Sequence, residues 1–91
     1  MEMDHPYSEE THTGSVVIRT FSANVDEMEL KWHWDEEDRI VEPVGETDWL
    51  FQFDNELPIK IYTQIHIPAG VIHRVIKGTG DLVVKITKIK R

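Results

Sequence analysis

The sequence predicts an all-β domain, arranged as a sandwich or barrel of about seven or more antiparallel strands. Three observations support this class. Val and Ile are abundant while alanine occurs only at Ala23 and Ala69, a balance that favours strands over helices. After Gly14, short segments rich in β-branched and aromatic residues alternate with turn-forming residues, and no segment has a convincing helical period. The length of 91 residues allows one modest core.

The expected strands follow one another at short intervals. They cover residues 15–21, 28–34, 39–44, 48–54, 58–67, 71–76 and 82–89. The breaks between them contain Pro, Gly, Asn and Asp, the usual residues of turns. Alternation is clear at Trp49, Phe51 and Phe53, which share one face of their strand, and in the four isoleucines of residues 58–67. Those faces are expected to form the core of a closed or nearly closed barrel.

Composition divides the chain into two parts. Residues 1–14 are mostly polar and include Pro6 and Gly14, so a flexible leader is expected there, with His5 and His12 outside any site. Residues 15–91 are expected to form the single domain. The N-terminus lacks the basic start and apolar run of a signal peptide, and no apolar stretch approaches the roughly 18 residues of a membrane helix. We therefore expect a soluble, cytoplasmic protein with no membrane partner.

Charge and cysteine content exclude several classes of function. With no cysteine, the chain cannot form disulfides or thiolate metal sites. The net charge of −7 argues against nucleic-acid binding, which depends on Lys and Arg. Residues 1–56 carry 16 acids and three bases, whereas residues 57–91 carry one acid and seven bases. The two halves therefore have net charges of about −13 and +6, which favours pairing between them, either within one barrel or across a dimer. A homodimer is the expected oligomer.

Residues 25–77 contain two stretches that resemble the motifs of the cupin superfamily. The first motif, with a His-x-His pair, a glutamate and a closing glycine, is matched by Lys31-Trp32-His33, Asp38 and Gly45. The second motif, with Pro-x-Gly followed by a histidine, is matched by Pro68-Ala69-Gly70 and His73. Both opening glycines are replaced, by Val25 and Tyr62, and the closing asparagine is replaced by Lys77. Residues 32–39 and 49–54, with Gly45, are similar to a group of small stand-alone cupins.

The resemblance implies a small cupin-type, jelly-roll-like barrel whose two motif histidines face each other across the interior. It also implies a divalent metal held by His33, Asp38 and His73, for which Fe, Mn, Zn and Ni are equally suitable. Asp35, two residues after His33, is an alternative carboxylate. No nucleotide cofactor is expected, because the chain has no phosphate-binding glycine loop.

Lys31 introduces a second hypothesis, because a cation at the position of the first motif histidine opposes metal binding. The barrel would then be a metal-free, non-catalytic module that binds a small anion or sugar. Candidate substrate-binding residues under either hypothesis are Lys31, Arg39, Gln52 and Trp49. His33 has a simpler alternative as part of a solvated face with Glu29 and Lys31. No complete catalytic set is recognisable, so the sequence assigns no reaction.

Overall fold

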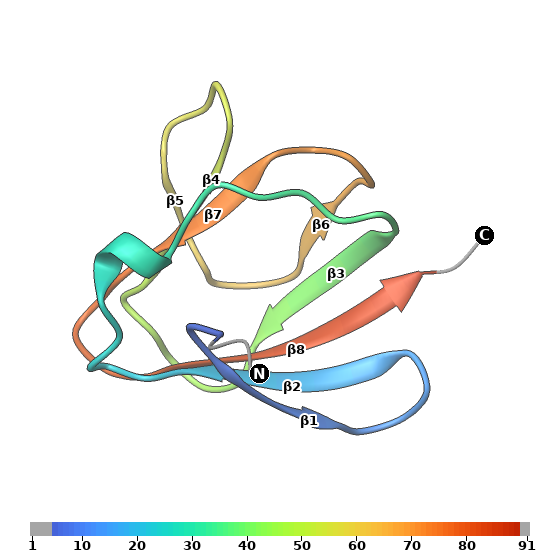
Figure 1. Cartoon of the computed structure of the whole chain (residues 1–91), viewed down its shortest axis with the longest axis horizontal. Helices are drawn as coiled ribbons and strands as arrows, with labels where there is room; N and C mark the ends of the chain where they lie inside the picture. Colours follow the sequence, from blue (N-terminus) through green and yellow to red (C-terminus); the bar gives the residue numbers. More distant parts are fainter. Residues whose placement is uncertain (1–4, 90–91) are drawn as a thin grey trace.

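The computed structural model describes residues 5–89, which confirm the all-β class (Figure 1). The strands are β1 (Ser8–Thr11), β2 (Val16–Phe21), β3 (Asp38–Pro43), β4 (Leu50–Phe53), β5 (Ile59–Lys60), β6 (Ile65–Ile67), β7 (His73–Ile76) and β8 (Leu82–Ile89). A short 3-10 helix, η1 (Glu27–Glu29), lies between β2 and β3. In the part of the chain described, no helix has the length and apolar character needed to cross a membrane.

The strands form two antiparallel sheets that face each other (Figure 1). One has five strands in the order β1-β2-β8-β3-β6, and the other has three in the order β5-β4-β7. Hydrogen bonding does not close the two sheets into one continuous barrel within residues 5–89, although an isolated bridge joins His33 to His73 of β7. The predicted closed or nearly closed barrel is therefore an arrangement of two facing sheets that hydrogen bonds do not close.

The core lies between the two sheets. Along β8 the buried residues Leu82, Val84 and Ile86 alternate with less buried ones, as expected for a strand with one face inward. Trp49 and Phe51 are buried as predicted, and so are three of the four isoleucines of residues 58–67. That segment forms two separate strands, β5 and β6, rather than one.

The segment 28–34 is not the strand that alternation predicts. The Asp26 side chain accepts a hydrogen bond from the Met28 backbone N–H at 2.9 Å and caps η1, so the chain first makes a tight turn. It then runs on outside any named strand, where His33 forms an isolated bridge with His73 and the Trp32 ring lies against the Arg74 guanidinium of β7. A local capping contact thus competes successfully with the strand pattern.

The predicted leader is also partly structured. Ser8–Thr11 form β1 and pair with β2, in a register that places Glu9 opposite Arg19. The ring of Tyr7 packs against Phe21, with ring centroids 5.4 Å apart. Residues 1–4 of the predicted leader lie outside the described residues. Backbone pairing to an existing strand stabilises this polar segment without requiring apolar side chains from it.

Candidate metal centre

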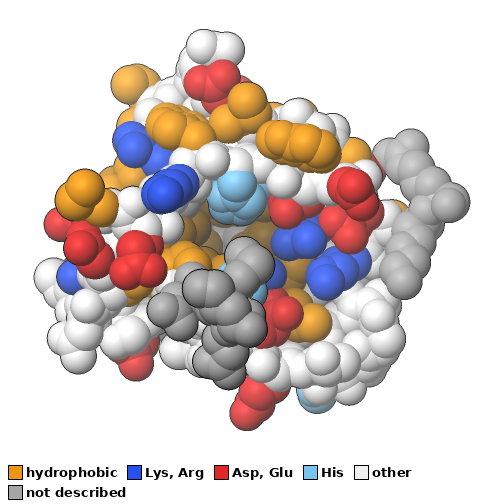
Figure 2. Space-filling view, in the orientation of Figure 1, with side chains coloured by type: hydrophobic (Ala, Val, Ile, Leu, Met, Phe, Trp, Pro, Cys, Tyr) orange, Lys and Arg blue, Asp and Glu red, His pale blue; other side chains and the backbone are white. Residues whose placement is uncertain are grey.

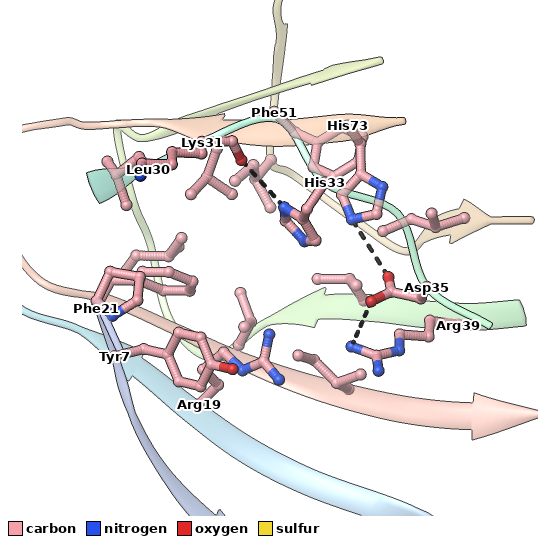
Figure 3. A pocket seen from close by; sticks show the side chains of 18 of the residues that line it. Tyr7, Arg19, Phe21, Leu30, Lys31, His33, Asp35, Arg39, Phe51 and His73 are labelled. Atoms are coloured by element: carbon pink, nitrogen blue, oxygen red, sulfur yellow. Dashed lines mark hydrogen bonds and ion pairs between the residues drawn. The ribbon is translucent and has the colours of Figure 1, made fainter. Parts of the chain in front are cut away.

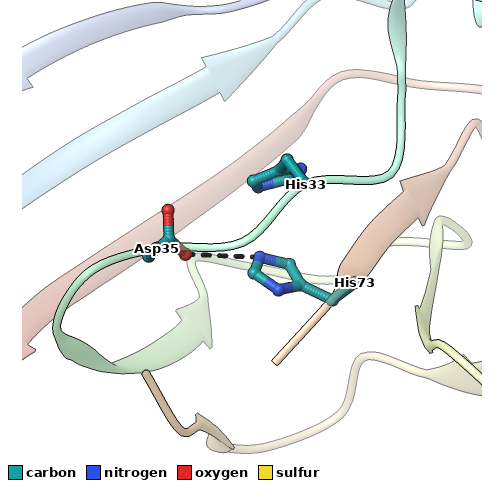
Figure 4. A group of neighbouring side chains, drawn as sticks. All are labelled: His33, Asp35 and His73. Carbon is teal, nitrogen blue, oxygen red and sulfur yellow. Dashed lines mark ion pairs between the residues drawn. The ribbon is translucent and has the colours of Figure 1, made fainter. Parts of the chain in front are cut away.

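The two motif histidines lie side by side, where the segment before β3 meets the first residue of β7 (Figure 4). Their backbones exchange two hydrogen bonds, from His33 N to His73 O at 3.0 Å and from His73 N to His33 O at 2.9 Å. Their rings are edge to face, with centroids 4.2 Å apart. The backbone bridge therefore fixes the distance between the two imidazoles.

Asp35 completes a group of three potential metal ligands with these histidines. One ligand atom from each of His33, Asp35 and His73 lies within 4.8 Å of the others. The closest approach that brings Asp35 into the group is Oδ2 to His73 Nε2 at 3.4 Å (Figure 4). Two imidazoles and a carboxylate that converge in this way form a recognised donor set for divalent transition metals.

Hydrogen bonding fixes which nitrogen of each histidine is available. His33 Nδ1 is 3.1 Å from the Lys31 carbonyl oxygen, and His73 Nδ1 is 2.9 Å from that of Val71. A carbonyl oxygen only accepts hydrogen bonds, so each Nδ1 carries a hydrogen and donates it. In the neutral tautomer this leaves the lone pair on Nε2, the usual arrangement of a metal-bound histidine with its second nitrogen held by the protein.

The surroundings of His73 favour its neutral form. It is 4% exposed, and burial lowers the pKa of its imidazole below the ordinary value of 6.5. Nearby His33 also lowers this pKa, while the Val71 carbonyl and Asp35 act in the opposite direction. A protonated His73 would form an ion pair with Asp35, but burial disfavours that state.

Asp35 has one carboxylate oxygen paired and one without a partner. Oδ1 lies 3.3 Å from Arg39 Nη1, whereas Oδ2 is buried and has no hydrogen-bond partner. A buried polar atom without a partner is costly unless something else satisfies it. Asp35 Oδ2 and His73 Nε2 lie 3.4 Å apart. With neutral His73 both atoms are acceptors, and two acceptors at this distance repel unless a cation lies beside both. The residues present therefore fit a metal ion.

The Pro68-Ala69-Gly70 turn holds both ends of the acidic run of residues 35–38 in place. Gly70 N–H donates to the Asp35 carbonyl oxygen, and Ala69 N–H donates to Asp38 Oδ1, both at 2.8 Å. Gly70 has φ +79°, in the left-handed region that favours glycine. The second motif thus positions Asp35 through the backbone as well as supplying His73.

Asp38 does not lie in the ligand group, contrary to its predicted place. Its buried carboxylate holds the Ala69 backbone through Oδ1, and Oδ2 lies 3.7 Å from Nε2 of the exposed His66. The alternative carboxylate, Asp35, takes the position beside the histidines. The physical reason is that Asp38 is the first residue of β3 and faces the Pro68–Gly70 turn.

The four predicted substrate-binding residues separate into two pairs. Lys31 and Arg39 line the cavity beside the histidines, whereas Gln52 and Trp49 do not. Trp49 is fully buried and donates its indole N–H to the Gly80 carbonyl oxygen at 2.6 Å. Gln52 accepts from Arg74 Nε at 3.0 Å and donates to the Glu56 carbonyl oxygen. Both side chains are committed to structural contacts.

His33, Asp35 and His73 line one end of a cavity of about 320 Å³ between the sheets (Figure 3). Figure 2 shows that the surface of the molecule is hollowed near the centre of the view, where histidine and basic side chains lie among hydrophobic ones. Most of the wall is apolar and comes from both sheets, with Leu30, Val41, Phe51, Ile67 and Val84 among its residues. The cavity therefore combines one polar corner with a hydrophobic interior.

Sequence reasoning missed Arg19, which also lines the cavity. A signal was present, because Arg19 lies two residues from Val17 and from Phe21 and so shares their face of β2. Both of those neighbours are buried. A charged residue on the inward face of a strand is uncommon and marks a position of interest.

Comparisons with known proteins support the fold. No family model and no curated protein matches the sequence. Among solved structures, KdgF from Halomonas sp. is 15% identical with a TM-score of 0.67, over 100% of this chain and 87% of its own. A cupin domain from Bordetella pertussis Tohama I is 18% identical with a TM-score of 0.56, over 98% and 100%. A chain from the crystal structures of the DMSP lyases RdDddP and RnDddQII is 16% identical, with a TM-score of 0.69 over 82% of this chain. The match covers only 37% of the length of that lyase-structure chain.

Proposed function

Since the chain has the fold of a small cupin, we propose that it binds a divalent transition-metal ion between its sheets. The ligands would be Nε2 of His33, Nε2 of His73 and Oδ2 of Asp35. The observation that carries the proposal is the buried Asp35 Oδ2, which has no hydrogen-bond partner and lies 3.4 Å from Nε2 of His73. A metal ion would satisfy both atoms at once.

The surrounding residues support metal binding by holding each ligand in one orientation. Backbone carbonyls hold Nδ1 of both histidines, and Arg39 holds the other oxygen of Asp35. Arg39 is itself shared with Glu37, whose carboxylate lies 3.2 Å away, so its charge is balanced. Such supporting partners orient the ligands and raise metal affinity.

Three protein ligands leave coordination positions on the metal open, so the metal would act as a Lewis acid toward a small molecule bound in the cavity. Fe, Mn, Zn and Ni all suit two imidazoles and a carboxylate. One structural neighbour is named a lyase, but a shared fold does not carry a reaction from one protein to another. The proposed function is therefore metal-dependent binding of a small ligand, with the reaction left unassigned.

Metal analysis of protein prepared without a histidine tag tests the proposal. The protein is stripped with a chelator, reconstituted separately with Fe(II), Mn(II), Zn(II) and Ni(II), and freed of excess metal before analysis. We expect stoichiometric binding of at least one of these ions, and less than about a tenth of an equivalent of every metal would exclude the site. His33→Gln should abolish binding, whereas His66→Gln, which changes an exposed histidine outside the group, should not.

A further inference from the structure

Arg19 occupies a position in β2 that normally belongs to the core. Its neighbours on the same face, Val17 and Phe21, are buried, and its own side chain is only 11% exposed. Burying a guanidinium among apolar side chains is unfavourable unless the charge is paired and hydrogen-bonded. The contacts of the Arg19 side chain therefore show which of its nitrogens are paired and which can bind a ligand.

Two of the three guanidinium nitrogens are engaged by one neighbour. Nε and Nη2 of Arg19 both donate to Glu9 Oε2, at 2.8 and 2.6 Å. The Arg19 guanidinium also lies over the Tyr7 ring, with Cζ 3.8 Å from the centroid. Nη1 has no hydrogen-bond partner among residues 5–89. One nitrogen of a fixed, nearly buried cation is thus left available.

Arg19 lines the same cavity as the candidate metal centre, on the other wall. Figure 3 shows Arg19 and Tyr7 on the side of β2, facing the side that carries His33 and His73. Most of the wall between them is hydrophobic, with contributions from Leu30, Phe51 and other apolar residues, while Lys31 and Arg39 line the cavity near the histidines. A ligand that fits this cavity would have an anionic end, an apolar body and a second end at the metal centre.

We propose that the cavity binds a small organic monoanion with an apolar body, held at its anionic group by Arg19. The cavity of about 320 Å³ is near the lower end of the range for ligand pockets, so the ligand is small. Glu9 already neutralises part of the Arg19 charge, which favours a single negative charge, as on a carboxylate, over the double charge of a phosphate. Only the contact between the metal and the end of the ligand opposite its anionic group rests on the proposed function.

The competing explanation is that Arg19 serves only to join β1 to β2 through Glu9, its direct partner in the register. Under that explanation Arg19→Gln and Glu9→Gln break the same ion pair and have the same consequences. Under the proposal they differ. Arg19→Gln removes the cation that holds the ligand, whereas Glu9→Gln removes only its structural partner.

The test is isothermal titration of the protein with hexanoate, its neutral amide hexanamide, and hexyl phosphate. We expect hexanoate to bind, and hexanamide to bind at least about tenfold more weakly, because it lacks the charge that pairs with Arg19. Arg19→Gln should weaken hexanoate binding at least about tenfold, while Glu9→Gln should leave it unchanged or strengthen it. Arg19→Lys, which keeps a cation, should bind hexanoate more tightly than Arg19→Gln does.

Several results would overturn the inference. These are equal affinities for hexanoate and hexanamide, no binding of either, wild-type affinity in Arg19→Gln, or tighter binding of hexyl phosphate than of hexanoate. If Arg19→Gln does not fold by circular dichroism, the comparison of hexanoate with hexanamide on the wild-type protein decides the question. Metal content is measured on every sample. Stoichiometric metal without hexanoate binding refutes this inference alone, and hexanoate binding without metal refutes only the proposed function.

Discussion

Asp35 and Asp38 lie three positions apart in the same run of four acidic residues, yet their contacts predict opposite consequences of substitution. Asp35 Oδ2 faces the histidines and has no hydrogen-bond partner, whereas Asp38 Oδ1 accepts the Ala69 backbone N–H at 2.8 Å. Asp35→Asn should therefore impair metal binding and leave the fold largely intact. Asp38→Ala should destabilise the fold and leave metal binding largely intact.

The magnitudes follow from these contacts. Asp38→Ala removes a buried hydrogen bond to a charged group, which contributes about 1.5–3 kcal/mol to the free energy of unfolding. In a domain of this size that loss lowers Tm by roughly 6–24 °C. Asp35→Asn keeps an oxygen for Arg39, which also retains Glu37, so the metal-free stability should change by about 1 kcal/mol or less.

For metal affinity the order of the two variants should be reversed, with the larger loss in Asp35→Asn. Loss of a residue that merely supports a ligand costs about 10–100-fold in metal affinity, and Asp35→Asn removes a proposed ligand itself, so its cost should be at least that large. Asp38→Ala removes no proposed ligand, so its cost in metal affinity should be smaller than that of Asp35→Asn.

Two measurements on each variant separate these effects. Urea unfolding in the presence of a chelator gives the free energy of unfolding without metal, and competition with a chromophoric chelator gives the metal affinity of the folded protein. If Asp38→Ala lost metal affinity while Asp35→Asn retained it, the ligand assignment would be wrong. If both variants lost stability equally, the structural role assigned to Asp38 would be wrong.

Three further predictions concern other parts of the molecule. Because burial lowers the pKa of His73 below 6.5, the unfolded chain takes up a proton before the folded one does as the pH falls. The stability of chelator-treated protein should therefore decrease as the pH falls below about 6.5, and His73→Gln should reduce that slope in urea titrations at several pH values. Gly78→Ala places a Cβ 2.7 Å from the Trp49 backbone nitrogen and also against Asp48, so it should cost about 1–3 kcal/mol in thermal unfolding. Gly80→Ala, where a Cβ meets no atom within 4 Å, is the control, and equal losses would contradict the packing argument. The homodimer stays a prediction, and the exposed side chain of Trp34, which is 58% accessible, is a candidate contact between the two copies. Trp34→Lys should then lower the sedimentation coefficient. A wild-type protein that sediments as a monomer would refute the homodimer.

The expected position of His73 depends on local geometry. A Pro-x-Gly turn followed by a histidine specifies a short length of backbone, and the structure places His73 where that length ends, at the start of β7. The choice between Asp35 and Asp38 could not be made in this way. Both belong to a run of four acids, and their roles depend on which one meets the Pro68–Gly70 turn across the fold.

The error over residues 28–34 has a related cause. Alternation of apolar and polar residues predicts a strand only if the backbone stays extended, and here the cap at Asp26 begins a 3-10 turn instead. Leu30 is buried while Trp34 is mostly exposed, so the two do not share the predicted face. Tertiary contacts, here the bridge of His33 to β7, decide where the chain becomes extended again.

The position of Asp35 also resolves the difficulty that Lys31 presented for metal binding. The cupin-like motif expects two ligands separated by one residue, and His33 with Lys31 does not satisfy it, but His33 with Asp35 has the same spacing in the other direction. In extended backbone, side chains two residues apart point to the same side, so Asp35 can converge with His33 as a second histidine at position 31 would have done. Lys31 then contributes its backbone carbonyl, which accepts the His33 Nδ1 hydrogen at 3.1 Å, and its charged group is absent from the ligand set. A lysine at this position is therefore compatible with a metal centre whose carboxylate lies on the other side of the histidine.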